Sequence, residues 1–212
     1  MKALGMIEVY SFSTAVAAAD AAAKAADVAV IAFDRNRPIS PDVPAPLVME
    51  IKLEGNVSAV KAAVEAASDF AKSEGKYIVS HIIANPAEDT EKMAYLLDIN
   101  RDKYNKKLPK TMKGAVPAPS SGEAIGLVEI QGLVAAVEGL DTMLKTAEVR
   151  LVHTEKRLGG RLVTMVIAGS VSAVSAAVES AVAAASPLGK VYGEEVIPGP
   201  HEEVLKFFDM EG

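Results

Sequence analysis

The side chains that could perform acid–base or metal chemistry are few and scattered along the chain. Three histidines, His81, His153 and His201, are too far apart in sequence for the short spacings typical of a metal site. The adjacent acids Glu194 and Glu195 are expected on opposite faces of a strand and need share no site. The sequence therefore predicts that the protein is not an enzyme and that it binds no metal ion and no cofactor.

Composition excludes several other classes of protein. The chain has no cysteine, which removes disulfides, thiolate nucleophiles and cysteine-held iron–sulfur clusters. Its 22 basic and 28 acidic residues give a net charge of -6, so a nucleic-acid partner is not expected. The apolar stretch 170–189 consists of Ala, Ser and Val around Glu179, which favours a packed helix over a membrane span. Glu8 interrupts any apolar run of a targeting segment, and we expect a cytoplasmic protein.

Two copies of one pattern organise the remaining residues. Residues 3–28 align without gaps to 124–149, with nine identities in 26 positions. After a change of register, 55–67 aligns to 169–181 with ten identities in thirteen. The Pro-, Gly- and Ser-rich residues between the copies are typical of a linker. We therefore divide the chain into a first domain at 1–108, a linker at 109–123 and a second domain at 124–212.

Each copy has the same predicted order of elements, β-α-β-β-α-β-α. In the first copy these elements are expected at 5–10, 13–26, 28–33, 47–53, 57–72, 77–83 and 88–107. In the second copy they are expected at 125–131, 135–147, 149–154, 162–168, 171–185, 190–197 and 202–208. This order predicts an α+β fold with two ferredoxin-like domains, each with helices on one face of a four-stranded antiparallel sheet.

Four short motifs of the second copy carry a resemblance to a known family. They are the strand 126–129 (GLVE), the Asp141/Lys145 pair, the glycine hairpin within 156–163, and the closing run 197–201 (IPGPH). In this order and spacing the motifs resemble those of the bacterial microcompartment shell domain. The first copy departs from the pattern, because it lacks the glycine hairpin and has Ala87 where the closing histidine is expected.

The resemblance implies which loops line a pore. In the family, the loop between the second and third strands surrounds a central pore, which implies pore-lining residues Arg157, Leu158, Gly159, Gly160 and Arg161 in the second copy. The first copy has a proline-rich loop at the same place, which implies Arg37, Pro38, Ile39, Ser40 and Pro41. Its prolines, three residues apart, favour a stiff segment. The alternative is an ordinary pair of hairpin turns.

The resemblance also implies which residues meet neighbouring tiles. Lys24 and Lys145 resemble the edge lysine of the family, although each also stands four residues after an aspartate and can form a simple helical ion pair. The remaining edge residues implied by the family pattern are Asn85, Gly199 and His201.

A tandem member of this family resembles two fused subunits, so three chains would imitate a hexamer. The expected function is a structural tile: a pseudohexameric homotrimer in the shell, beside other shell proteins and around encapsulated enzymes, with a pore for small metabolites. A ligand-sensing regulatory trimer on the same kind of fold is the alternative. No membrane partner is expected.

Overall fold

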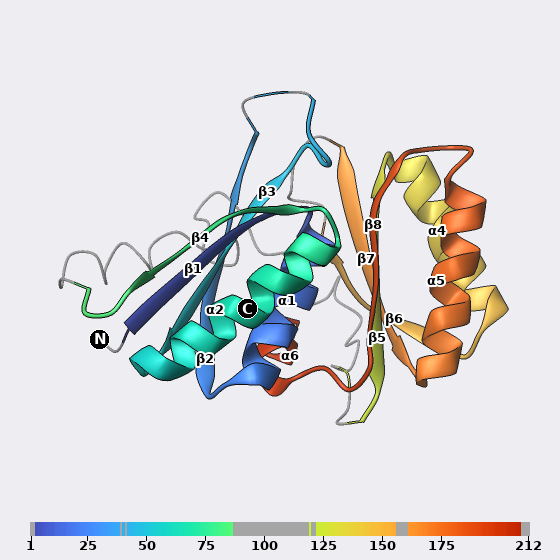
Figure 1. The fold of residues 1–212 in the computed structure, drawn as a ribbon. Coiled ribbons are helices and arrows are strands. Elements are labelled where there is room, and N and C mark those ends of the chain that lie inside the picture. The colour runs from blue at the N-terminus through green and yellow to red at the C-terminus, as the bar shows by residue number, and fades with distance from the viewer. Residues whose placement is uncertain are drawn as a thin grey trace, which may run out of the picture. The chain divides into compact units, whose positions relative to one another are not determined.

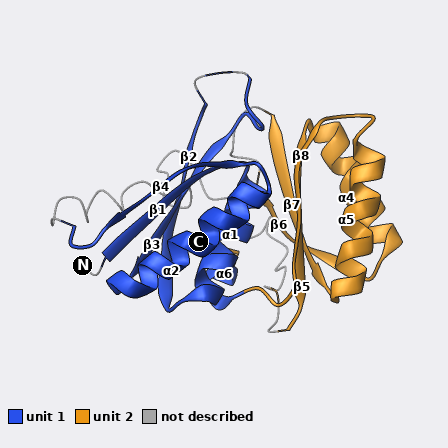
Figure 2. Ribbon diagram, in the orientation of Figure 1, with its two compact units in different colours: residues 1–107, 201–207 blue, residues 108–200, 208–212 orange. Residues whose placement is uncertain are grey.

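The computed structural model describes residues 3–38, 40, 42–86, 119, 122–155 and 161–208. The chain divides into two compact units, coloured separately in Figure 2. Unit 1 comprises residues 1–107 together with 201–207, and unit 2 comprises residues 108–200 together with 208–212. The C-terminal residues 201–207, which the repeat assigns to the second copy, therefore belong to the compact unit of the first.

Unit 1 is a four-stranded antiparallel sheet with two helices packed on it (Figure 1). The strands have the order β2-β3-β1-β4. The elements are β1 (Ala3–Tyr10), α1 (Phe12–Ala25), β2 (Val28–Asn36), β3 (Val48–Gly55), α2 (Val57–Ser73) and β4 (Tyr77–Ile83).

Unit 2 repeats this arrangement with the strand order β6-β7-β5-β8. The elements are β5 (Ala124–Gln131), α4 (Leu133–Thr146), β6 (Val149–Glu155), β7 (Leu162–Gly169), α5 (Val171–Ala185) and β8 (Val191–Ile197). A short helix, α6 (Glu202–Leu205), follows β8 and packs in unit 1. The predicted α+β fold with two similar domains is confirmed. The helix predicted at 88–107 lies outside the described residues.

The two sheets agree in register as well as in order. Ala3 stands opposite Gly55 in unit 1, and Ala124 stands opposite Gly169 in unit 2. The outer strands β2 and β6 each carry an irregularity three residues after their first residue. Strands β1 and β5 each carry one directly after a glutamate, Glu8 in β1 and Glu129 in β5. The repeat seen in the sequence is thus a repeat of strand pairing, including its irregularities.

A glycine in the first strand of each unit lets a helix lie close to the sheet. A Cβ atom on Gly5 would stand 2.7 Å from Val64 Cγ2, and one on Gly126 would stand 2.7 Å from Val174 Cγ1. Real side chains do not approach so closely. This accounts for the glycine of the first motif, which leaves room for α2 in unit 1 and α5 in unit 2.

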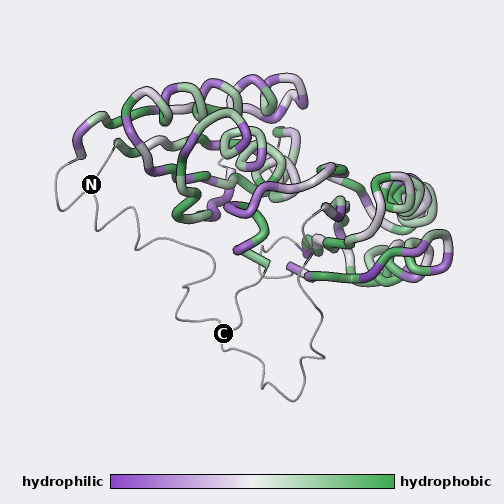
Figure 3. The backbone as a smooth tube through the Cα atoms, turned by 90° about the horizontal axis from the view of Figure 1, so that it is seen from below, coloured by the Kyte–Doolittle hydropathy of each residue, from purple (hydrophilic) through white to green (hydrophobic). Residues whose placement is uncertain are grey.

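Small side chains fill the interface between the helices and the sheets. The buried face of α2 consists of Val60, Ala63, Val64, Ala67, Ser68 and Ala71, and that of α5 of Val174, Ala177, Val178, Ala181 and Ala185. Figure 3 shows hydrophobic residues along the coils of α4 and α5 in unit 2. Within the described residues, no helix is both long enough and apolar enough to span a membrane.

Candidate pore loops and subunit edge

The structure describes one end of the second predicted pore loop. Arg157, Leu158, Gly159 and Gly160 lie outside the described residues. Arg161 is exposed, begins the turn into β7 and has a φ angle of 63°, a conformation that few residues other than glycine adopt. Its carbonyl accepts a hydrogen bond of 2.9 Å from the amide of Gly132.

The first predicted pore loop is exposed at its tip and anchored at its returning end. Arg37 and Ser40 are exposed, Pro38 is half-buried, and Ile39 and Pro41 lie outside the described residues. The Asp42 amide donates to Ser40 Oγ over 3.1 Å, and the Arg37 amide donates to Asn36 Oδ1 over 2.8 Å. Just beyond the loop, Ala45 and Leu47 are fully buried.

One hydrogen bond fixes the exit of the predicted pore loop in both units. The Ser11 amide donates to the Leu47 carbonyl over 3.1 Å, and the Gly132 amide donates to the Arg161 carbonyl over 2.9 Å. Leu47 and Arg161 occupy equivalent positions directly before β3 and β7. Both donors have positive φ angles, 79° for Ser11 and 104° for Gly132. The sharp turn from strand to helix thus holds the loop exit at a fixed place in each sheet.

Two of the predicted edge residues of unit 1 converge on a third residue, Asp20. Lys24 Nζ lies 2.6 Å from Asp20 Oδ2, and the main-chain amide of His201 donates to Asp20 Oδ1 over 2.8 Å. The Asp20 side chain is only 7% exposed. Sequence reasoning treated Asp20 as half of a helical ion pair. The structure shows that its carboxylate also accepts a hydrogen bond from the C-terminal segment that the repeat assigns to the second copy.

The remaining predicted edge residues are exposed. Lys145 Nζ lies 2.6 Å from Asp141 Oδ2, with both side chains largely in solvent, and this hydrogen bond raises the pKa of the Lys145 ammonium. Asn85 follows β4 and Gly199 follows β8. Gly199 has a φ angle of 55°, so it turns the chain in a conformation that suits glycine. Both lysines therefore form the helical ion pair, and their role at a tile edge stays a prediction.

The short helix α6 is held on unit 1 by contacts that sequence reasoning missed. Glu203 Oε2 accepts a hydrogen bond of 2.8 Å from the amide of Val30, on the outer strand β2. The Phe207 ring packs edge-on against Phe33 with 4.7 Å between the ring centroids. Val204 is fully buried. The only sequence signal was the acidic, apolar pattern of 203–207, which does not identify the surface that it covers.

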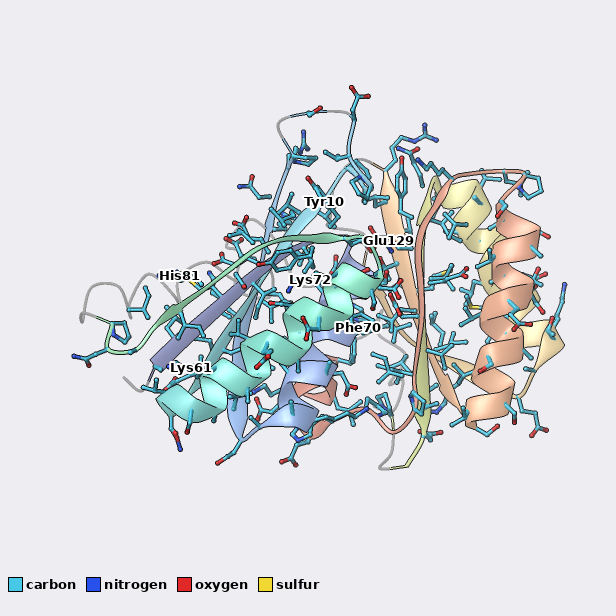
Figure 4. All side chains as sticks on the ribbon, viewed as in Figure 1. Tyr10, Lys61, Phe70, Lys72, His81 and Glu129 are labelled. Atoms are coloured by element: carbon cyan, nitrogen blue, oxygen red, sulfur yellow. The ribbon has the colours of Figure 1, made fainter. Side chains whose placement is uncertain are left out.

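The three histidines occupy unrelated places. His81 is exposed on β4 (Figure 4). His153 lies on β6, where its ring is 5.7 Å from that of Phe208 and its Nε2 is 3.7 Å from Glu155 Oε2. The Nδ1 atom of His201 accepts from the Glu203 amide over 3.2 Å and so caps α6. In the described part of the chain, no group of three His, Asp or Glu side chains is placed to hold a metal ion.

A row of carboxylates crosses the sheet of unit 1. Glu50 on β3 stands opposite Glu8 on β1 and Asp34 on β2. Burial raises the pKa of the Glu50 carboxyl, the charges of Asp34 and Glu8 add to this effect, and Lys52 opposes it. Lys52 Nζ lies 3.7 Å from Glu50 Oε2 and its side chain is 4% exposed. Burial and neighbouring acids thus favour the protonated form of this carboxyl.

The comparison with known families decides what these paired units are. The family model described as the BMC domain matches residues 3–86 and again residues 124–200. The chain belongs to the BMC domain family. The two matches coincide with the strands and helices of units 1 and 2, so each unit of this microcompartment shell protein is one BMC domain.

Curated relatives agree with this assignment. The bacterial microcompartment shell protein PduA of Citrobacter freundii is 49% identical over 84 residues, which cover 40% of this chain and 89% of the relative. The carboxysome assembly protein CcmO of Synechococcus elongatus is 31% identical over 203 residues, which cover 96% of this chain and 67% of the relative. Thus one relative matches a single BMC domain and the other matches both.

A solved structure of a microcompartment protein from Desulfitobacterium hafniense DCB aligns with 97% of this BMC chain and 99% of its own. The two are 24% identical and the TM-score is 0.38, too low to support a conclusion about the arrangement of the two domains.

Proposed function

We propose that this shell protein forms a homotrimer in which six BMC domains make one pseudohexameric tile with a central pore. The observation that carries the proposal is the double match to the BMC domain, together with the equal strand order and register of the two units. Because each chain has two units of the same fold, a trimer has six similar domains, and these can close into a ring.

The pore of this tile is proposed to be lined alternately by two kinds of loop. The proline-rich loop contributes Arg37, Pro38, Ile39, Ser40 and Pro41, and the glycine loop contributes Arg157, Leu158, Gly159, Gly160 and Arg161. Exposed Arg37 and Arg161 support a pore that favours small anionic metabolites, because their guanidinium groups attract negative charge. The two loops differ in sequence, so the pore would have threefold symmetry.

The edge of the tile is proposed to contain Lys24, Lys145, Asn85, Gly199 and His201. A lysine can lay its apolar stem along a neighbouring tile while its ammonium reaches carbonyl groups. The exposure of Lys24 and Lys145 supports this role. The partners would be other shell proteins at the edge and encapsulated enzymes on one face, in a shell within the cytoplasm. The role is structural and the chain catalyses no reaction.

The mass of the native particle tests the trimer. One chain has a mass of 22.1 kDa, so three chains give 3 × 22.1 = 66.3 kDa. Native mass spectrometry is expected to find this mass at micromolar concentration. A monomer at 22.1 kDa would overturn the proposal. Trimers that bind a metabolite tightly and never associate laterally would favour the ligand-sensing alternative.

A further inference from the structure

The two proposed pore loops leave their sheets through strand pairs of different charge. In unit 1, the strands β2 and β3 run side by side to the proline-rich loop (Figure 1). Near the loop end of these strands, Asp34 stands directly opposite Glu50. The equivalent pair on β6 and β7 of unit 2 is Glu155 and Thr164. The stem of the first loop, defined as residues 34–36 and 48–50, therefore pairs two acids, whereas the stem of the second pairs an acid with a hydroxyl.

A third acid extends the pair in unit 1. Glu8 on β1 stands opposite Glu50, which thus lies between two acids on neighbouring strands. A Cβ atom on Gly5 would point at Val64 of α2, so Glu8, three residues later, lies on the sheet face away from this helix. Residues directly opposite each other share a face. Glu8, Glu50 and Asp34 thus form one row on this face, named the acid row below.

The surroundings of Glu50 favour its protonated form. Among the described residues, the charged groups that act on it are Glu8 from β1, Asp34 from β2 and Lys52 from its own strand. Burial raises the pKa of the Glu50 carboxyl, Lys52 lowers it from 3.7 Å away, and the two acids raise it. The side chain is still 24% exposed, so its proton can exchange with water. Glu50 therefore keeps its proton to a higher pH than an ordinary glutamate.

Loss of this proton weakens the strand pairing beside the loop. Like charges directly opposite each other on paired strands are destabilising, and an ionised Glu50 faces an acid on each side. Two residue pairs, Arg35 with Met49 and Asn36 with Val48, lie between the acid row and the loop. Pairs at the end of a ladder open at little free-energy cost, so we expect them to separate when the row is fully ionised. Because its prolines keep the loop stiff, a separated stem moves the loop as one piece.

We propose that the stem of the proline-rich loop is a proton-sensitive hinge, which is held while Glu50 carries a proton and loosens when the acid row is fully ionised. The glycine loop of unit 2 lacks this hinge, because Thr164 does not ionise. At the pore, loosening frees Arg37 from a fixed position and adds negative charge at the base of the loop. Passage of small anions should therefore fall as pH rises. This last step rests on the proposed pore, whereas the hinge itself does not.

Hydrogen exchange of the native protein at two pH values tests the hinge. Between about pH 4.5 and about pH 8, and after correction for the intrinsic exchange rate, protection of residues 34–36 and 48–50 should fall several-fold. Helix α2 should keep its protection over the same range. A fall of equal size along α2 would show that the whole unit loses stability and would overturn a local hinge, as would a stem whose protection does not change.

A matched pair of variants assigns the effect to Glu50. Glu50→Gln is neutral like the protonated carboxyl, so its stem should stay protected at both pH values. Glu54→Gln removes an acid from the same strand and the same face, where its opposite residues are Leu4 and Ala29 rather than acids. This control should keep the fall of the wild-type protein. A fall that persists in Glu50→Gln, or that disappears equally in both variants, would overturn the role of the acid row.

Flux across assembled sheets or shells tests the link to the pore. The solutes are a small sulfonate, which stays ionised over the whole pH range, and a neutral molecule of similar size. In the wild-type protein the ratio of sulfonate flux to neutral flux should fall several-fold as pH rises, and in Glu50→Gln it should stay high. A ratio that ignores pH, or that falls equally in both proteins, would overturn the regulation and leave the pore standing. If neither solute passes at any pH, the proposed pore is contradicted and the link to passage with it.

Discussion

The main-chain amide of His201 donates a hydrogen bond of 2.8 Å to the carboxylate of Asp20, 181 residues earlier in the chain. The same carboxylate binds Lys24 over 2.6 Å. Asp20 therefore connects the first helix of unit 1 with the segment that leaves the second BMC domain. The stability of this buried carboxylate depends on both partners, because a charged group that is removed from water and left unpaired costs free energy.

Removal of the Asp20 carboxylate should release α6. Asp20→Ala is expected to lower the free energy of unfolding by about 1–3 kcal/mol, because it leaves the part-buried His201 amide without its acceptor. Hydrogen exchange of residues 201–207 should accelerate in the same variant. The control Asp69→Ala removes an exposed ion pair with Lys72 and should change stability by less than about 0.5 kcal/mol. Unchanged exchange at 201–207 would contradict the role of Asp20.

The aromatic contact of α6 can be tested independently. Phe207→Ala removes a half-buried ring that packs on Phe33 at 4.7 Å, and should cost roughly 1–3 kcal/mol in denaturant unfolding. Leu188→Ala, at a side chain that is 54% exposed, is the control and should cost much less. Equal losses in the two variants would show that Phe207 does not anchor α6.

The glycine of the first strand should not tolerate a methyl group. Gly126→Ala places a Cβ atom 2.7 Å from Val174 Cγ1 and 2.8 Å from Val178 Cγ2, and this overpacking should cost about 1–3 kcal/mol. Val174→Ala should make room for that methyl. In a double-mutant cycle measured by thermal unfolding, the double variant should lose less stability than the sum of the two single losses. Additive losses would contradict the close packing of α5 on β5.

Glu50 should make stability fall as pH rises. Its pKa is raised in the folded protein above the ordinary value of 4.5, so the folded state holds a proton that the unfolded state has released. The stabilisation is fully present below the ordinary value and is lost as pH rises through the folded pKa. Glu50→Gln should therefore flatten the fall in unfolding free energy above about pH 4.5 in urea titrations. An unchanged slope, or stability that rises with pH, would contradict this.

The charge of Arg161 should influence passage of anions through the proposed pore. Arg161→Gly removes the guanidinium and suits the φ angle of 63°, so the fold should be kept or slightly stabilised while the flux of small carboxylates falls. Flux across reconstituted shells or sheets is the measurement, with a neutral solute as the control. Equal carboxylate flux in both proteins would argue against an anion-favouring pore.

The sequence predicted the fold because local patterns and the repeat agree. Strand alternation, helix spacing and the two alignments place the eight strands of the two sheets, and the four helices α1, α2, α4 and α5, within a few residues of their observed bounds. Gly126 belongs to the first sequence motif, and the repeat alignment places Gly5 at the equivalent position. The physical reason for these glycines is the close approach of α2 and α5 to the sheets, which can be seen only in the contacts of the structure.

The placement of the C-terminal segment was not predictable from the pattern. The repeat alignment assigns 201–207 to the second copy, whereas these residues pack on α1 and β2 of unit 1. A short amphipathic segment specifies an apolar face but not the surface that this face covers. The hydrogen bonds from the His201 amide to Asp20 and from the Val30 amide to Glu203 are long-range pairings that local spacing does not encode.

Negative-stain electron microscopy of the purified chain, at low and high protein concentration, tests the central claim most directly. A shell tile should appear as hexagon-like discs with a central hole and threefold symmetry, which join edge to edge into flat sheets as concentration rises. Lys24→Ala and Lys145→Ala should weaken the joining while leaving the discs intact. Discs that never join, or particles with no central hole at any concentration, would contradict the claim that this BMC protein is a shell tile.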